Sequence, residues 1–232
     1  MKLAELPFLS IQGEGPKIGQ IALFIRFQGC SMQPPCSFCD TGYSIKKPDD
    51  KVGIEVSFHD ILDIISQTKI RNVVFTGGEP LLYQNDIAKL IPLFDSAQIE
   101  TNGIETLDIL SYHTNLNDRK KIFFNISPKL HSIAIDSYFG NIKDIVSKQD
   151  IYGGYCLKLV YSDNDVDIID FLFKLNPKYI TELSNHVYIM PECKTRDEHL
   201  EAQEGALDFC KKYGFNFCPR AHILMYDRRK GV

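Results

Sequence analysis

The feature of this sequence that most constrains its fold is the alternation of short, β-rich apolar runs with amphipathic helical segments. The runs that read as strands are residues 21–27, 72–76, 97–100, 121–127, 155–161, 187–191 and 215–218. The segments that read as helices are residues 57–67, 86–94, 166–175 and 196–213. Strands that alternate with helices predict parallel βαβ units, and the loops at the carboxyl ends of such strands carry the functional site.

The ends of two predicted helices carry local signals. Ser57 is a suitable N-cap for the first helix, and Gly214 is the expected residue after the end of the last one. Two segments show no clear pattern, residues 116–120 and 131–154, and we expect irregular structure or insertions there.

Composition excludes several classes of protein. The chain has 232 residues, of which 44% are hydrophobic, enough for one core, and we expect a single domain over residues 1–232. A net charge of −4 does not favour direct nucleic-acid binding. The first residues lack the apolar segment of a signal peptide, and no apolar run is long enough to span a bilayer. We therefore expect a soluble cytoplasmic protein without a membrane partner.

Three cysteines lie close together in the segment GCSMQPPCSFCDT, at Cys30, Cys36 and Cys39. In a reducing compartment such a cluster indicates metal ligands or catalytic thiols more often than disulfides. Three thiolates suit a zinc site completed by a fourth ligand, or a four-iron cluster that keeps one iron open for a substrate or cofactor. The cysteines alone leave both possibilities open. The four remaining cysteines are scattered, and we expect them to be small buried side chains.

A glycine pair follows the next strand, in the segment TGGEP at residues 76–80. Gly77 and Gly78 would allow the backbone to approach a ligand closely, with its N–H and C=O groups available for hydrogen bonds.

The chain resembles the radical S-adenosylmethionine (SAM) superfamily in three features. They are a cysteine loop after the first long strand, an aromatic residue (Phe38) before the last cysteine, and GGEP after the second strand. The resemblance implies an α/β fold, a partial (β/α)6 TIM-like barrel with the cluster loop after its first strand. It also implies a [4Fe–4S] cluster on Cys30, Cys36 and Cys39, with SAM on the open iron. Gly77, Gly78 and Glu79 would then meet the SAM amino group. Five residues separate Cys30 from Cys36, where the superfamily usually has three.

Further segments narrow the resemblance: QGEG before the cluster, CDT at its end, then ETNG, ISPK, MPE and PRAHILMYDRRKGV in that order. Together they resemble the 7-carboxy-7-deazaguanine synthase family of queuosine biosynthesis. This implies ring contraction of 6-carboxy-5,6,7,8-tetrahydropterin to 7-carboxy-7-deazaguanine with release of ammonia, and Mg²⁺ as an additional cofactor. It also implies an electron donor such as flavodoxin or ferredoxin, and a homodimer.

The same resemblance assigns individual residues. The expected pterin contacts are Ile11, Gln12, Gly13, Glu14, Arg26, Thr76 and His222. The expected Mg²⁺ ligand is the hydroxyl of Thr41, and Arg26 would pair with the substrate carboxylate. The remaining contacts with SAM would come from Ser127, Pro128, Lys129, Met190, Pro191 and Glu192.

Two other functions stay open at this point. A radical SAM activase of a glycyl radical enzyme would share the cysteine loop and the glycine turn, but would act on a protein. A zinc-stapled binding module without enzymatic activity would share only the cysteines.

Overall fold

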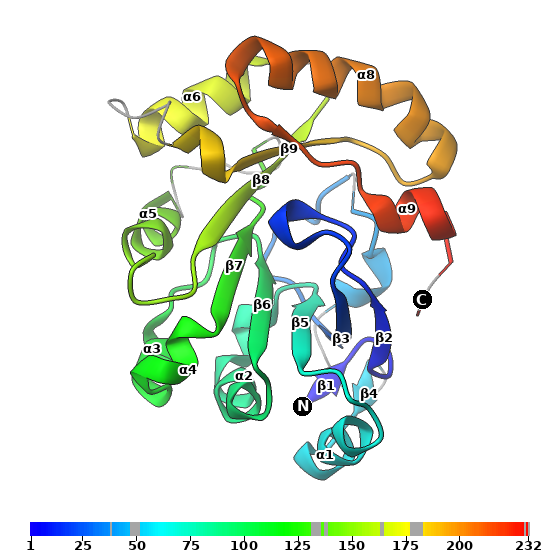
Figure 1. Ribbon diagram of the computed structural model, residues 1–232, viewed down its shortest axis with the longest axis vertical. Coiled ribbons are helices and arrows are strands. Elements are labelled where there is room, and N and C mark those ends of the chain that lie inside the picture. The colour runs from blue at the N-terminus through cyan, green and yellow to red at the C-terminus, as the bar shows by residue number, and fades with distance from the viewer. Residues whose placement is uncertain are drawn as a thin grey trace.

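The computed structural model describes residues 1–37, 39–46, 52–130, 136, 139–162, 165–176, 183–229 and 231. Within these residues one curved, open sheet of ten strands forms the centre of the molecule (Figure 1). The strand order is β10-β9-β8-β7-β6-β5-β3-β1-β4, with β2 also paired to β3. The strands are β1 (Lys2–Leu3), β2 (Phe8–Ile11), β3 (Ile21–Phe27), β4 (Ile54–Glu55), β5 (Asn72–Gly77), β6 (Ser96–Thr101), β7 (Ile122–Ile126), β8 (Tyr155–Tyr161), β9 (Val187–Pro191) and β10 (Asn216–Phe217).

The strands predicted from apolar runs are those that pair in parallel. β3 pairs with β5, and the series continues through β6, β7, β8 and β9 to β10, each neighbour parallel to the last. The predicted open barrel of parallel strands, with the cysteine loop after its first strand, is confirmed. The short strands β1, β2 and β4 were not predicted, and they extend the sheet in antiparallel pairing.

Helices cover the outer face of the sheet (Figure 1). They are α1 (Phe58–Ser66), α2 (Gln84–Leu90), α3 (Asp108–His113), α4 (Leu116–Lys120), α5 (Phe139–Ser147), α6 (Asp165–Leu175) and α8 (Arg196–Tyr213). A further helix, α9 (Ala221–Tyr226), packs against α8. Short 3-10 turns occur elsewhere in the chain, namely η1 (Gly15–Lys17), η2 (Gly42–Ser44), η3 (Pro80–Tyr83), η4 (Ile91–Leu93) and η6 (Ser184–His186). The predicted ends of two helices are confirmed. Ser57 forms a capping box with Asp60, and Gly214 follows α8 in the left-handed conformation, with φ 74°. The predicted helix 86–94 ends at Leu90 and continues as the 3-10 turn η4, which contains Pro92.

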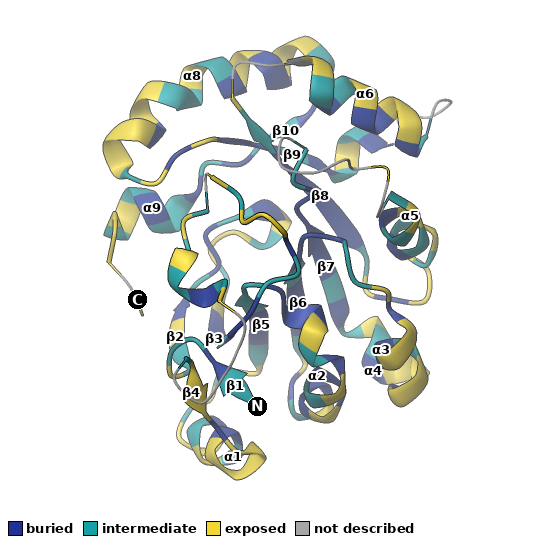
Figure 2. Cartoon of the chain, turned by 180° about the vertical axis from the view of Figure 1, so that it is seen from behind, coloured by how far each residue is buried: buried dark blue, intermediate teal, exposed yellow. Residues whose placement is uncertain are grey.

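Side chains alternate between the two faces of each parallel strand. On β6, Ala97 and Ile99 are fully buried in the hydrophobic core beneath the helices, whereas Gln98 and Glu100 point to the inner face. The same alternation places Lys158 of β8 on the inner face, between the core residues Leu157 and Leu159. Figure 2 shows the buried strands at the centre and, around them, helices whose outer sides are exposed. The outer face therefore supplies the core, and the inner face supplies polar side chains.

The expectation of irregular structure is wrong for residues 116–120 and for residues 139–147, which are helical, whereas residues 148–154 form turns and bends as expected. Residues 116–120 form α4, whose N-cap Asn115 accepts a hydrogen bond from the backbone N–H of Asp118. Within 131–154, α5 packs Ile142 and Ile145 into the core. Both helices are short, so their apolar pattern is weak in the sequence. Residues 131–135 and 137–138 lie outside the described residues.

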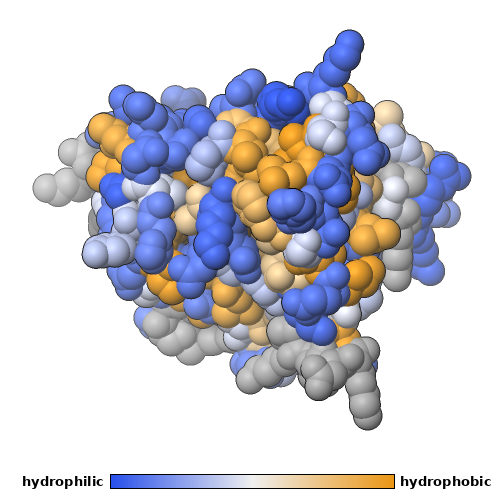
Figure 3. All heavy atoms as spheres, turned by 90° about the horizontal axis from the view of Figure 1, so that it is seen from below, coloured by the Kyte–Doolittle hydropathy of each residue, from blue (hydrophilic) through white to orange (hydrophobic). Residues whose placement is uncertain are grey.

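The end of the molecule seen from below carries apolar side chains scattered among hydrophilic ones (Figure 3). Exposed apolar residues of α1 and α3 include Phe58, Ile109 and Tyr112. Among the described residues, no helix is both long and apolar enough to cross a membrane.

The cap of α4 gives a direct test of why this segment is helical. Asn115→Ala removes the side-chain acceptor for the Asp118 N–H and should lower the free energy of unfolding by about 1 kcal/mol. Asn115→Ser keeps an acceptor and should stay close to the unchanged protein. Urea unfolding measures both variants. Equal losses in the two would show that the cap does not stabilise α4.

Candidate active site

A cavity of about 620 Å³ lies at the carboxyl ends of the parallel strands. This volume is in the range of small-molecule sites. Its walls include β2, β3, β5, β6, β8 and β9, the cysteine loop and α9. Most of the residues predicted to form the site line this cavity: Ile11, Gln12, Gly13, Glu14, Arg26, Cys30, Cys36, Cys39, Thr41, Thr76, Gly77, Gly78, Ser127, Lys129, Met190, Pro191, Glu192 and His222. Glu79 and Pro128 are not among the lining residues.

All three cysteines of the cysteine loop line this cavity. The loop is held by a hydrogen bond from the Cys39 N–H to the Cys36 carbonyl (3.2 Å), and Lys194 donates to the Ser37 carbonyl (3.0 Å). Burial raises the pKa of Cys30 against a hydrogen bond from the Met32 N–H, and the charge of Glu79 raises it further, so without a bound metal this group is a neutral thiol. Phe38 lies outside the described residues.

The donor set fits an iron–sulfur cluster. Among the described residues, no three His, Cys, Asp or Glu side chains are grouped closely enough to hold a single metal ion. A cubane cluster binds each thiolate at a different iron, so its ligands do not converge on one point. Three cysteines on one loop that lines one cavity can serve as such ligands.

The glycine turn after β5 lies directly against the backbone that precedes Cys30. A Cβ at Gly78 would lie 2.0 Å from the Gly29 carbonyl oxygen, and Gly77 has a φ of 134°. The Glu79 N–H donates to the same Gly29 carbonyl (2.8 Å). Only glycine permits this contact, which places the turn and the cysteine loop side by side.

Glu79 lies behind the turn and is fully buried. Its carboxylate accepts hydrogen bonds from the backbone N–H groups of Leu81 (3.0 Å) and Asn102 (2.8 Å). Burial raises its pKa to about 7, although these hydrogen bonds oppose the shift. In this structure the Glu79 side chain joins two strand-end turns, those after β5 and β6.

A chain of ion pairs crosses the inner wall of the cavity. Glu14 accepts from Lys158 (2.6 Å) and from Arg220 (2.8 Å). Lys158 also pairs with Glu100, and Arg220 pairs with Asp40, the residue between Cys39 and Thr41. Burial alone would raise the pKa of Glu14, but the charges of Lys158 and Arg220 outweigh it and hold that pKa well below its usual value. Glu14 is therefore an ionised carboxylate at neutral pH.

Arg26 projects from β3 toward the cavity and is paired within the protein. Its Nε lies 2.6 Å from Glu5, which also accepts from the hydroxyl of Tyr43 (2.8 Å). The predicted pairing of Arg26 with a substrate carboxylate would therefore take place beside Glu5.

His222 stands on α9 rather than at the end of a strand, and it packs against Gly13. A Cβ at Gly13 would lie 2.2 Å from its Nδ1, and the Ala221 N–H donates to the Gly13 carbonyl (2.8 Å). Burial lowers the pKa of His222.

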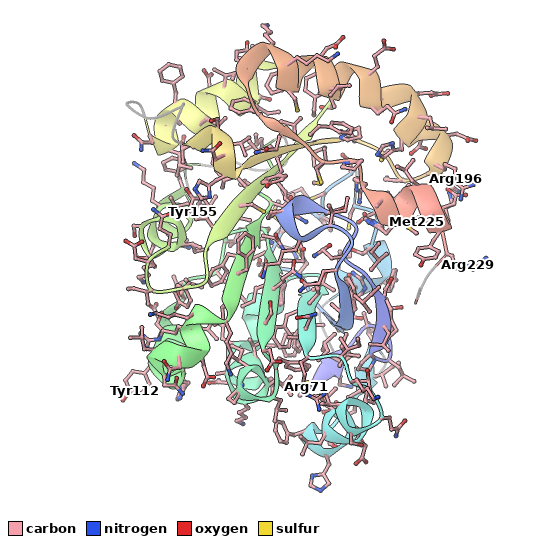
Figure 4. All side chains as sticks on the ribbon, in the orientation of Figure 1. Arg71, Tyr112, Tyr155, Arg196, Met225 and Arg229 are labelled. Atoms are coloured by element: carbon pink, nitrogen blue, oxygen red, sulfur yellow. The ribbon has the colours of Figure 1, made fainter. Side chains whose placement is uncertain are left out.

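Figure 4 shows Arg196, at the start of α8, beside Met225 of α9. Arg196 donates to the carbonyls of Leu224 (2.8 Å) and Met225 (3.1 Å), and these bonds hold α9 against the start of α8.

Several residues of the wall were missed in the sequence: Glu5, Asp40, Glu100, Lys158 and Arg220. Two of them carried a usable signal. Glu100 ends a short run that predicts a strand, and Lys158 stands within an apolar strand; a buried charge at either position requires a partner. The partners lie far apart in the chain, so the pattern identifies these charges without pairing them.

The class of protein follows from a comparison with known families. Residues 24–139, half of the chain, match the model of the radical SAM superfamily. This segment runs from β3 through the cysteine loop and the glycine turn to the start of α5. The fold and the site thus define a radical SAM protein, and this membership implies a [4Fe–4S] cluster and SAM as cofactors.

Individual relatives identify a narrower family within this superfamily. The 7-carboxy-7-deazaguanine synthase of Pyrobaculum aerophilum is 28% identical, over 97% of this chain and 94% of its own. That of Thermoplasma acidophilum is 33% identical, over 71% of this chain and 73% of its own. The crystal structure of QueE from Escherichia coli has the same fold, with a TM-score of 0.61 at 21% identity, over 93% of this chain and 92% of that one. The chain belongs to the 7-carboxy-7-deazaguanine synthase family of radical SAM proteins.

The contact between Gly78 and Gly29 predicts an effect on the cysteine loop. Gly78→Ala should lower the free energy of unfolding by about 1–3 kcal/mol, because the added methyl meets backbone that cannot move aside. It should also reduce the iron bound after reconstitution, since the displaced segment carries Cys30. Gly42→Ala is the control, because its Cβ would meet nothing within 4 Å. Full iron content in Gly78→Ala would contradict the prediction.

The buried Glu79 predicts a pH dependence of stability. Its pKa is about 7 in the folded protein and near 4.5 in an unfolded chain, so the folded state binds the extra proton between these values. Its contribution to stability is therefore complete below pH 4.5 and declines as the pH rises through 7, by about 3 kcal/mol in total. In protein without cluster, the difference in unfolding free energy between the unchanged protein and Glu79→Gln should decline over this window. A difference independent of pH would show that Glu79 is ionised throughout.

Proposed function

We propose that this protein converts 6-carboxy-5,6,7,8-tetrahydropterin to 7-carboxy-7-deazaguanine with release of ammonia, in queuosine biosynthesis. The observation that carries the proposal is the composition of one cavity. It joins the cysteine loop and glycine turn of a radical SAM site to Glu14, Arg26 and His222, which the resemblance to the synthase family assigns to the pterin.

The polar groups of the cavity suit a pterin. Glu14 is an ionised acceptor for ring N–H and amino donors, and Arg26 is a cation for the substrate carboxylate. When bound, the cluster and SAM supply the radical chemistry that starts the rearrangement. Within the chain, Cys30, Cys36 and Cys39 would hold the cluster. The backbone of Gly77 and Gly78 would bind the SAM amino group.

Other expected contacts are part of the same proposal. Ser127, Lys129 and the segment Met190–Glu192 line the cavity and would contact SAM. Thr41 would provide an oxygen ligand for Mg²⁺, with the Asp40 carboxylate beside it; hard oxygen donors suit this ion. An electron donor such as flavodoxin or ferredoxin would reduce the cluster. A homodimer in the cytoplasm completes the proposal.

Substitution of each cysteine tests the assignment of the cluster. Cys30→Ala, Cys36→Ala and Cys39→Ala should each abolish the EPR signal of the reduced [4Fe–4S] cluster, because each removes the ligand of one iron. Cys210→Ala should keep the signal, since Cys210 packs in the hydrophobic core. A variant of the loop that retains a signal responsive to SAM would remove that cysteine from the ligand set.

Turnover tests the reaction itself. Reconstituted, reduced protein with SAM and Mg²⁺ should convert the tetrahydropterin to 7-carboxy-7-deazaguanine, with one ammonia released per product. A cluster that responds to SAM without pterin turnover would favour the activase. A colourless protein with one bound zinc would favour the binding module.

A further inference from the structure

Lys158 is a buried cation that joins two carboxylates of the cavity wall. Its Nζ lies 2.6 Å from Oε2 of Glu14 and 2.5 Å from Oε2 of Glu100, and its side chain is 3% exposed. Burial would lower the pKa of Lys158, but Glu100 and Glu14 outweigh this and raise it, so the side chain remains an ammonium ion. A charged lysine does not act as a base, and its role has to be sought in what it holds.

The two carboxylates differ in how firmly the fold holds them. Glu100 is part of β6, and its Oε1 accepts from Asn125 (2.8 Å) and Gln12 (3.1 Å). Glu14 lies in the connection after β2, at the start of the short turn η1, and its own side chain does not cap that turn. Lys158 therefore ties a carboxylate on a connecting segment to one that is fixed on a central strand.

The Glu14 carboxylate keeps capacity for a ligand while it is held in this way. An ionised carboxylate offers about four acceptor positions. Lys158 occupies one on Oε2 and Arg220 one on Oε1 (2.8 Å), with His222 Nε2 3.8 Å from Oε1. The remaining positions suit the adjacent N–H donors of a 2-amino-4-oxo-pyrimidine ring.

We propose that Lys158 is a positioning residue, which holds the Glu14 carboxylate against Glu100 in the orientation that accepts hydrogen bonds from the pterin ring. The inference rests on the proposed function and adds to it the residue that orients one substrate contact. Lys158 acts through Glu14 and needs no contact with the substrate of its own.

Calorimetry can test this positioning role by measuring pterin affinity. The sample is the reconstituted, unreduced holoenzyme with SAM. Lys158→Met should weaken binding of 6-carboxytetrahydropterin about 10–100-fold, as expected when a residue that orients a ligating group is lost. The change in the EPR signal of the separately reduced cluster on adding SAM should remain. Lys158→Arg should recover most of the affinity, because a guanidinium can bridge both carboxylates. Lys211→Met, at an exposed ion pair with Asp208, is the control and should bind as the unchanged protein does.

A double-mutant cycle separates positioning from direct contact. If Lys158 acts through Glu14, Glu14→Gln combined with Lys158→Met loses no more affinity than the worse single variant. Losses that multiply would overturn the inference, and so would unchanged affinity in Lys158→Met or an equal loss of the response to SAM. If Lys158→Met does not fold, Lys158→Gln, which keeps the donors without the charge, provides the same test.

Amide hydrogen exchange measured without pterin tests whether Lys158 holds Glu14 in place, independently of substrate binding and of the reaction. In Lys158→Met, amides of residues 12–18 should exchange faster, whereas those of β5 should not change. Failure of the unchanged protein to bind pterin would overturn the proposed function. The exchange measurement would then decide by itself whether Lys158 positions Glu14. Unchanged exchange in residues 12–18 would overturn the inference that Lys158 positions Glu14.

Discussion

Charge pairing on the inner face of the sheet is the constraint on which the arrangement of this protein depends. Strand alternation commits one face to the hydrophobic core, so the charged residues of the same strands must point inward. A charge in such a place is stable only beside an opposite charge or several hydrogen-bond donors. Lys158 therefore requires acids nearby, and Glu14 requires the two cations that the wall supplies. The ion pairs determine where the connecting segments run, and these segments enclose the cavity.

The sequence predicted the parts of the fold that rest on local, repeated signals. Apolar runs identified the parallel strands because each is buried on one face beneath helices. The strands β1, β2 and β4 escaped prediction because they span only two to four residues, too few to show a clear alternation of apolar and polar side chains. The helix α4 escaped for a different reason. Its cap at Asn115 was present in the sequence, but a single turn of helix shows too little apolar periodicity to be recognised.

The candidate site also has parts that local motifs predict and parts that they do not. The cysteine loop and the glycine turn are contiguous motifs, and their positions on the cavity could be predicted from order alone. The ion pairs could not, because Glu14 meets Lys158 across 144 residues and Arg220 across 206. Motif residues also differ in what they do. Gly77 and Gly78 face the cavity, whereas Glu79 of the same motif turns away from it and fastens the turns after β5 and β6 together.

These sequence separations have a consequence for the order in which the molecule is built. Contacts between distant residues form late in folding, because a long segment must first be closed into a loop. The pair of Glu14 with Arg220 joins the first barrel segment to the region after the last strand, and the contact of Gly13 with His222 does the same. A ribosome-bound chain that has released β3 to β9 already contains the thiols, the glycine turn and Lys158, but not Arg220, which pairs with both Glu14 and Asp40. The cavity wall is completed only after the last strand has been synthesised, so iron can meet the cysteines before the substrate pocket exists.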